Sequence, residues 1–272
     1  MLSKILFVAM LLHALNIRAQ TVLSNTGAKN EALGSSTSVS ADEWSLWRNP
    51  AGLALLEQTM ISSGVRKTQG INAFTRSVVV ASSTRFASLG AGVSSFGDDI
   101  YNEQAASVAA AHTIGLASIG VRGDIMQLRI DGSSTKRAFG ITIGTIARIT
   151  PRLSVGACAH NINLPQWARG QPLPVVLSAG LLYRPTENFL LITEVEKNTD
   201  FDPTFKGAME YSLRKKFFVR TGFNLFPNNA FGGVGLRTWR LAFDYAIRFG
   251  YLPGYSQQLS IGVNATKIKQ RK

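Results

Sequence analysis

Alternation of apolar and polar residues over segments of about ten residues is the feature that most constrains this chain. Residues 153–160 carry Leu, Val and Ala at odd positions and Ser, Gly, Cys and His at even ones. Residues 241–248 repeat the pattern, with Leu, Phe, Tyr and Ile separated by Ala, Asp and Arg. Successive side chains of a strand point to opposite faces, so a period of two predicts β-strands with one apolar face. The sequence therefore predicts an all-β protein.

Segments of this kind follow one another from about residue 57 onward, separated by clusters of Gly, Pro, Asn or Asp that are typical of turns. We predict about 14 strands, near 57–66, 71–82, 85–95, 102–115, 117–129, 136–149, 152–162, 173–184, 187–197, 203–213, 215–224, 229–238, 239–249 and 256–269. A closed antiparallel barrel with both ends on one side of a membrane needs an even number of strands. Tilted strands of 9–11 residues are long enough to cross the bilayer.

The residues of the polar face distinguish a barrel from a soluble β-sandwich. A sandwich would bury its apolar face and present Lys, Glu and Asp to water on the other. Here the polar face is mostly Ser, Gly, Thr and Ala, and 17% of all residues are charged whereas 45% are hydrophobic. Small polar residues with scattered charges suit the interior of a barrel whose exterior faces lipid. The sequence favours a transmembrane antiparallel β-barrel over residues 57–269, and the sandwich is the alternative.

The first residues have the pattern of a secretory signal peptide. Met1–Lys4 is short and basic, Ile5–Leu15 is apolar except for His13, and a small residue precedes Gln20. This apolar run is shorter than the roughly 20 residues of a membrane-spanning helix. We therefore predict a signal peptide over residues 1–19, export from the cytoplasm, and a mature chain that begins at Gln20.

The charge balance is basic, with 29 Lys and Arg against 16 Asp and Glu, a formal net charge of +13. A basic protein attracts nucleic acid or anionic surfaces, but an exported protein does not meet nucleic acid. We expect outer-membrane lipid, including lipopolysaccharide, or acidic envelope proteins as partners, and no nucleic acid. The single Cys excludes a disulfide framework.

Residues 20–56 lack alternation and carry three short motifs. They are Gly27-Ala28-Lys29-Asn30-Glu31-Ala32-Leu33-Gly34, Ser38-Val39-Ser40-Ala41-Asp42 and Trp47-Arg48-Asn49-Pro50-Ala51-Gly52-Leu53. These motifs resemble the amino-terminal signature of the FadL and PorV-type outer-membrane barrels. The resemblance implies a 14-stranded barrel in the outer membrane, with residues 20–56 folded inward as a hatch. Its motif residues are Gly27, Ala28, Gly34, Asp42, Trp47, Asn49, Pro50, Ala51, Gly52 and Leu53.

Local chemistry adds expectations for the hatch. Asn49-Pro50 ends any preceding helical turn, and Gly52 eases a change of direction into the first strand. Trp44 and Trp47 either plug the barrel interior or lie in an interfacial aromatic belt. Asp42 and the following Glu43 either pair with arginines of the inner wall or lie in a solvated turn.

Placing the polar face of each strand inward predicts a set of charges in the barrel interior. The set is Arg122, Asp124, Arg148, Glu194, Glu196, Lys206, Glu210, Arg220, Arg237, Asp244 and Arg248. Opposite charges then face one another across neighbouring strands. We expect an ion-pair network that braces the interior, and a substrate path is the alternative.

Catalytic residues are sparse. After removal of the signal peptide only His112 and His160 remain, on different predicted strands, so neither a histidine metal cage nor a catalytic triad can be assembled. Cys158 lies two residues from His160, and we interpret it as an inert interior residue. We expect no enzymatic activity, no metal and no cofactor.

The resemblance implies two functions. One is a PorV-like accessory subunit of a larger outer-membrane machine for protein secretion or assembly, of the type IX kind. The other is a FadL-like passive transporter of small hydrophobic molecules. Connections that average about five residues leave little room for a ligand-collecting vestibule, which favours the accessory subunit. The basic tail at residues 270–272 is a surface extension or an arm for an acidic partner.

Overall fold

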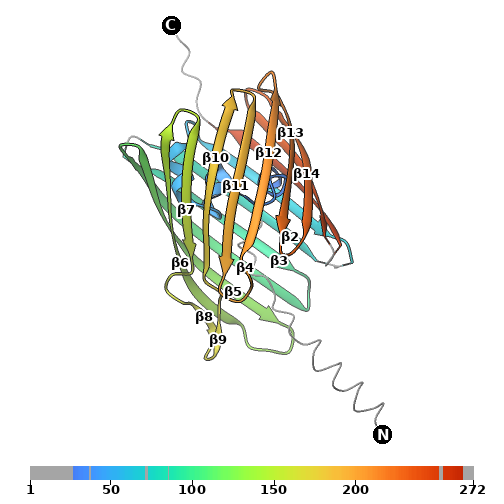
Figure 1. Ribbon diagram of the computed structural model, residues 1–272. Helices are drawn as coiled ribbons and strands as arrows, with labels where there is room; N and C mark the ends of the chain where they lie inside the picture. The colour runs from blue at the N-terminus through green and yellow to red at the C-terminus, as the bar shows by residue number, and fades with distance from the viewer. Residues whose placement is uncertain (1–26, 37, 71–72, 85, 251–253, 266–272) are drawn as a thin grey trace.

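The computed structural model describes residues 27–36, 38–70, 73–84, 86–250 and 254–265, and its main element is a closed antiparallel barrel (Figure 1). Fourteen strands form the barrel, which confirms the predicted fold class. The predicted signal peptide (1–19) and basic tail (270–272) lie outside the described residues.

Each barrel strand pairs with the next along the chain, except that β7 pairs with β10 because a small hairpin separates them. The strands are β1 (Met60–Thr68), β2 (Phe74–Ser83), β3 (Ser88–Gly97), β4 (Tyr101–Ile114), β5 (Ala117–Ile130), β6 (Lys136–Thr150), β7 (Leu153–His160), β10 (Val176–Thr186), β11 (Phe189–Asn198), β12 (Thr204–Leu213), β13 (Phe217–Leu225), β14 (Asn229–Arg237), β15 (Leu241–Gly250) and β16 (Tyr255–Asn264). β16 pairs with β1 from Met60↔Asn264 to Thr68↔Ser256 and closes the barrel. Closure leaves the wall without an edge whose N–H and C=O groups lack partners, as a hydrocarbon surrounding requires.

The outside of the wall is apolar and the inside is small and polar. In β2, Val78 and Val80 are exposed on the outside while Ser77 and Val79 are buried on the inside. The other strands show the same division, and Phe139 is one of many outward side chains that are more than half exposed. Leaving so much apolar surface in water would cost about 25 cal/mol per Å², whereas lipid removes that cost. The alternation therefore describes a lipid-facing wall. No helix in the described residues is long and apolar enough to cross a membrane.

The two ends of the barrel differ. At one end, called here the turn end, tight connections such as residues 115–116 and 151–152 join the strands. At the other, the loop end, residues 161–175 form a longer connection that contains the hairpin of β8 (Gln166–Ala168) and β9 (Gln171–Pro172) (Figure 1). This connection exceeds the expected average of about five residues.

The N-terminal segment lies inside the barrel, where Figure 1 shows it in blue behind the strands. It contains α2 (Ala28–Ala32) and two 3-10 helices, η2 (Glu43–Leu46) and η3 (Pro50–Leu55). α2 packs against β13 to β16, and η2 and η3 pack mainly against β1 to β6. The segment therefore reaches across the interior from one wall to the other.

Candidate functional site

We define the hatch as the described residues between 27 and 56. At its start, the backbone at Gly27 passes close to the Trp44 side chain. Gly27 has a φ of +88°, and a Cβ there would lie 2.6 Å from the Trp44 ring, so only glycine fits. The Ala28 N–H donates to Ser260 Oγ on β16 at 3.1 Å and ties the first turn of α2 to the wall. Gly34, with a φ of +62°, follows α2 in the left-handed conformation that commonly ends helices.

The acidic pair of the hatch is buried and does not contact wall arginines. Asp42 precedes η2 and forms an ion pair with Lys29 of the hatch itself, with 2.9 Å between Nζ and Oδ2. Glu43 accepts a hydrogen bond from Ser62 Oγ on β1 at 2.6 Å. Burial and then the neighbouring Asp42 raise the pKa of the Glu43 carboxyl, although the Ser62 hydrogen bond acts in the opposite direction. Of the expected alternatives, neither the arginine pairing nor the solvated turn describes these two residues.

Asn49 is the polar anchor between hatch and wall. It is fully buried, and its Nδ2 donates to the carbonyl oxygens of Ser38 at 2.5 Å, Thr145 at 3.1 Å and Ala157 at 3.2 Å. Its Oδ1 accepts from the Ala51 N–H at 3.1 Å, which caps η3. One side chain thus joins two hatch segments to β6 and β7.

The residues after Asn49 form η3 rather than a turn into the first strand. Pro50 is its first residue, where a missing N–H costs nothing. Gly52 was expected to ease a change of direction, and this expectation was wrong: its φ is not positive, and a Cβ there would lie 2.3 Å from the Ser40 carbonyl oxygen. Gly52 therefore permits close packing within the hatch. The Leu53 side chain is fully buried and lies against Gly90 on β3.

Both tryptophans of the hatch are buried in the interior, as the lumen-plug alternative requires. Their ring centroids lie 5.9 Å apart with a tilted arrangement. Trp47 is 1% exposed, and its Nε1 donates to Ser107 Oγ on β4 at 3.0 Å. A buried indole N–H with a partner is stable in this position. The hatch therefore carries an aromatic centre against β1 to β4.

Inward glycines of the wall accommodate the hatch backbone. A Cβ at Gly120 on β5 would lie 2.3 Å from the Pro50 carbonyl carbon, and one at Gly156 on β7 would lie 2.3 Å from the Ser38 carbonyl oxygen. A Cβ at Gly144 on β6 would lie 1.9 Å from Asn49 Oδ1. Sequence reasoning missed these contacts, although glycines at inward positions of several neighbouring strands were the available signal.

Ion pairs occupy both walls of the interior. On β5, Arg122 and Asp124 are buried, with 2.8 Å between Nε and Oδ2, and the Arg122 Nη1 donates to the Leu46 carbonyl oxygen of the hatch at 3.0 Å. Lys206 on β12 contacts Glu194 at 3.2 Å and Glu196 at 2.7 Å on β11. Glu194 in turn accepts from the Ser38 N–H at 2.7 Å. These pairs hold the hatch as well as the wall.

A second group centres on Arg220 of β13, which pairs with Glu210 on β12 and, at 2.6 Å, with Asp244 on β15. Arg237 on β14 also contacts Asp244 at 2.7 Å. Opposite charges on adjacent strands therefore meet, because antiparallel register places Glu210 opposite Arg220. Arg248 on β15 approaches Glu31 of α2 at 3.8 Å.

Arg148 does not belong to the interior group. It is exposed at the turn end of β6, where the register with β7 shifts between Arg148 and Thr150. The alternation alone could not show that this strand continues past the buried interior. Cys158 and His160 do lie together inside, with 3.6 Å between Sγ and Nε2, and Cys158 also lies 3.2 Å from the Arg48 carbonyl oxygen. The described residues hold no group of three or more His, Cys, Asp or Glu that could bind a metal.

One apolar cluster runs along the interior beside β2 to β6. Near the loop end it contains Leu173 and the partly buried Trp167 of the 161–175 connection. It continues through Met126 and Ala138 to Leu46, Leu53 and both hatch tryptophans. Its other buried members are Val79, Ala81, Ala105, Ala109 and Ala111. At the turn end a pocket of about 390 Å³ lies against Trp44, Leu56 and Met60.

Comparison with known proteins identifies this architecture. No protein-family model matches the sequence, and no curated protein matches it significantly. Among solved structures, the Pseudomonas putida toluene transporter TodX matches with a TM-score of 0.70 at 12% identity, covering 90% of this chain and 98% of that one. The chain has the fold of the FadL-type outer-membrane barrels.

Two further structures agree. The Ralstonia pickettii toluene transporter TbuX matches with a TM-score of 0.65 at 13% identity, covering 89% of this chain and 97% of that one. A FadL homologue of Pseudomonas aeruginosa matches with a TM-score of 0.63 at 11% identity, over 88% and 97%. The sequence-based preference for a PorV-like accessory subunit finds no support in these comparisons.

Proposed function

We propose that this protein is a FadL-type outer-membrane channel for passive passage of small hydrophobic molecules, and that its hatch is closed in this structure. The observation that carries the proposal is the apolar cluster that links the loop end of the barrel to the hatch tryptophans. Likeness in fold to toluene transporters supports it and suggests monoaromatic hydrocarbons as probes.

The route begins at the 161–175 connection. Leu173 is 4% exposed although it belongs to a loop, and its N–H donates to the Pro165 carbonyl oxygen at 2.8 Å. Asn161 Nδ2 donates to the Pro174 carbonyl oxygen at 2.8 Å and holds the same loop at the mouth. This loop therefore provides an apolar entrance, for which connections of only about five residues would leave no room.

Ligand chemistry follows from how the charges are arranged. Most interior ion pairs lie on β11 to β15, across the barrel from the apolar cluster, and Arg122 on β5 is neutralised by Asp124. Paired, buried charges brace a wall and offer no free charge to an ion. An uncharged molecule that prefers apolar contacts is therefore the suitable cargo.

Passage requires the hatch to move, because the hatch spans the interior. Single polar contacts hold it to the wall, among them those of Asn49, the Ser38 to Glu194 hydrogen bond and the Arg122 to Leu46 hydrogen bond. A plug held by several buried hydrogen bonds opens locally without unfolding the barrel. We therefore propose gating by displacement of the hatch.

Uptake of radiolabelled toluene by Gram-negative cells that lack their own hydrophobic-compound channel tests the proposal. We expect the wild-type chain to raise the initial rate above that of cells with an empty vector. Leu173→Glu, which places a carboxylate in the apolar cluster, should return the rate to the background.

Leu164→Glu is the matched control, because Leu164 lies in the same loop but is 64% exposed. It should transport like the wild type, and heat-modifiable migration on gels verifies that each variant forms a barrel. Uptake by the wild type equal to the empty vector, or equal loss from both variants, would contradict the proposal.

A further inference from the structure

Charged side chains on the lipid-facing surface occur at one end of the barrel and carry one sign. Among the described strands, the outward-facing charged residues are Lys67, Arg76, Arg129, Arg137 and Lys197. All are cations, and all lie near the loop end of their strands. Four of them belong to β1, β2, β5 and β6, which lie within six consecutive strands of the barrel, so the positive charge concentrates on one sector of the wall.

Within this sector, the outward side chains of paired residues on β2 to β6 form two parallel rows across the strands. Arg76, Ser95, Gln104, Gln127 and Arg137 are successive register partners from β2 to β6 and form a polar row. Two residues further from the loop end, a second row crosses the same strands. It consists of Val78, Val93, Ala106, Ile125 and Phe139.

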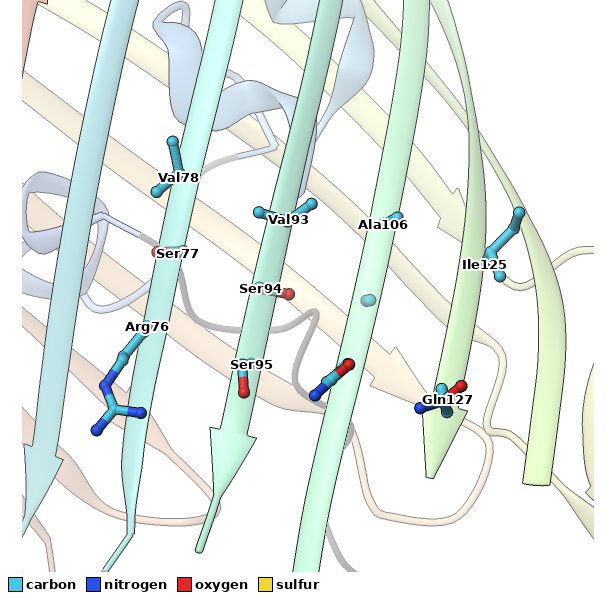
Figure 2. A pocket seen from close by; sticks show the side chains of 11 residues that line it. Arg76, Ser77, Val78, Val93, Ser94, Ser95, Ala106, Ile125 and Gln127 are labelled. Atoms are coloured by element: carbon cyan, nitrogen blue, oxygen red, sulfur yellow. The ribbon is translucent and has the colours of Figure 1, made fainter. Parts of the chain in front are cut away.

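Small side chains in the middle of the rows leave a groove on the wall. The groove has a volume of about 440 Å³, and Figure 2 shows its two levels, with Arg76, Ser95 and Gln127 on one and Val78, Val93, Ala106 and Ile125 on the other. Its lining includes the small side chains of Ser95 and Ala106, on strands between β2 and β5. The groove is thus amphipathic along the membrane normal.

We propose that this groove binds a phosphorylated glycolipid of the lipopolysaccharide class in the outer leaflet. Its two phosphates contact Arg76 at one end of the polar row and Arg137 at the other end, and an acyl chain crosses the apolar row. The inference rests on the outer-membrane location proposed above, with the loop end outward because the longer connections of outer-membrane barrels are extracellular. Arginine suits this role because its guanidinium binds phosphate through paired, charge-assisted hydrogen bonds.

The surroundings of the groove favour an anionic head group. The Arg76 and Lys67 cations both lie 5.4 Å from the centroid of the Phe74 ring, which positions them beside the groove. Arg137 Nε donates to Gln127 Oε1 at 3.3 Å, which directs that side chain along the polar row. These contacts fix the side chains of Arg76 and Arg137 at the two ends of the polar row, and the residues between them are neutral.

Acidic residues occur in the connections next to the polar row, where their carboxylates accept hydrogen bonds from backbone N–H groups of the same turns. Asp98 accepts the N–H groups of Ile100 and Tyr101 at 2.9 Å each, and Asp131 accepts the Gly132 N–H at 3.1 Å. Asp99 lies in the same connection as Asp98. The rows themselves contain cations and neutral residues alone, so their charge complements phosphate.

Native mass spectrometry of the full chain in detergent tests the inference. The probes are bisphosphorylated lipid A, the same lipid with its phosphates removed, and phosphatidylglycerol. We expect lipid A to bind, removal of phosphates to abolish binding, and phosphatidylglycerol to bind more weakly. Arg76→Gln and Arg137→Gln should each weaken lipid A binding about tenfold, the range of a lost charge-assisted phosphate contact.

Lys197→Gln is the matched control, because Lys197 is an outward cation at the same end but lies on β11, outside the groove. It should bind lipid A like the wild type. Equal binding of the dephosphorylated lipid, or equal weakening by all three substitutions, would overturn the inference. Toluene uptake by Arg76→Gln should remain at the wild-type rate, so loss of transport and loss of lipid binding are separable outcomes.

Discussion

Replacing Asn49 with Ala tests whether one amide anchors the hatch. The substitution removes the donor that serves the Ser38, Thr145 and Ala157 carbonyl oxygens and the acceptor that serves the Ala51 N–H. Each buried polar group left without a partner costs about 1–3 kcal/mol, and hatch groups can regain water once the hatch is displaced. We therefore expect opening of the hatch to require about 2–3 kcal/mol less free energy in Asn49→Ala than in the wild type.

The lone thiol of the chain provides the assay. Cys158 is 4% exposed and lies beneath the Arg48 carbonyl oxygen, so a membrane-impermeant maleimide reaches it only when the hatch moves. Because about 1.4 kcal/mol corresponds to a factor of ten, the labelling rate should rise roughly 30- to 150-fold in Asn49→Ala. Asn198→Ala, which removes a half-buried asparagine at the loop end of β11 whose Oδ1 accepts from the Asp200 N–H and not from the hatch, should leave the rate unchanged.

A second substitution separates hydrogen bonding from packing. Asn49→Asp keeps the shape of the side chain but directs a carboxylate oxygen toward three carbonyl oxygens, so labelling should accelerate at least as much as in Asn49→Ala. A rate within threefold of the wild type in both variants would refute the anchoring role. Acceleration in Asn49→Ala alone would show that packing, and not the hydrogen bonds, holds the hatch.

Three further predictions concern the same interior. Gly120→Ala should displace the hatch and raise single-channel conductance in planar bilayers, because its Cβ would overlap the hatch backbone, whereas Gly232→Ala, with open space around it, should behave like the wild type. Arg220→Met removes the guanidinium that pairs with both Glu210 and Asp244, leaving only Arg237 beside Asp244, and should lower barrel stability by about 3–5 kcal/mol in urea unfolding in detergent; an unchanged midpoint would contradict this. Burial, and then the adjacent Asp42 carboxylate, raise the pKa of Glu43 in the folded state above its ordinary 4.5. The protonated Glu43 carboxyl therefore stabilises the folded hatch fully below pH 4.5, and this stabilisation is lost as the pH rises through the raised pKa. Protease cleavage of the hatch should therefore accelerate over that window in the wild type and lose this dependence in Glu43→Gln.

Alternation along the chain predicted the fourteen barrel strands and the inward placement of most charged side chains, with Arg148 as the exception. Each strand is long enough for its period of two to be read without ambiguity, and tight turns then set the antiparallel register. For this reason the charges of Glu194, Lys206, Glu210 and Arg220 could be expected to meet before any contact was known. The prediction that Arg148 lies in the interior was wrong because a strand can extend beyond the buried interior, and the residue pattern does not mark where the interior ends.

The sequence by itself determined the strand pattern and the division into an apolar exterior and a small, polar interior, since both follow from local geometry. The tertiary structure alone decided what the hatch contacts. Asn49 reaches Ala157 across 108 positions in the chain, and Glu43 meets Ser62 instead of an arginine, because barrel closure sets which inward side chains surround the plug. The rows of the lipid-facing groove likewise exist only once five strands lie in register, since no single strand contains more than one member of each row.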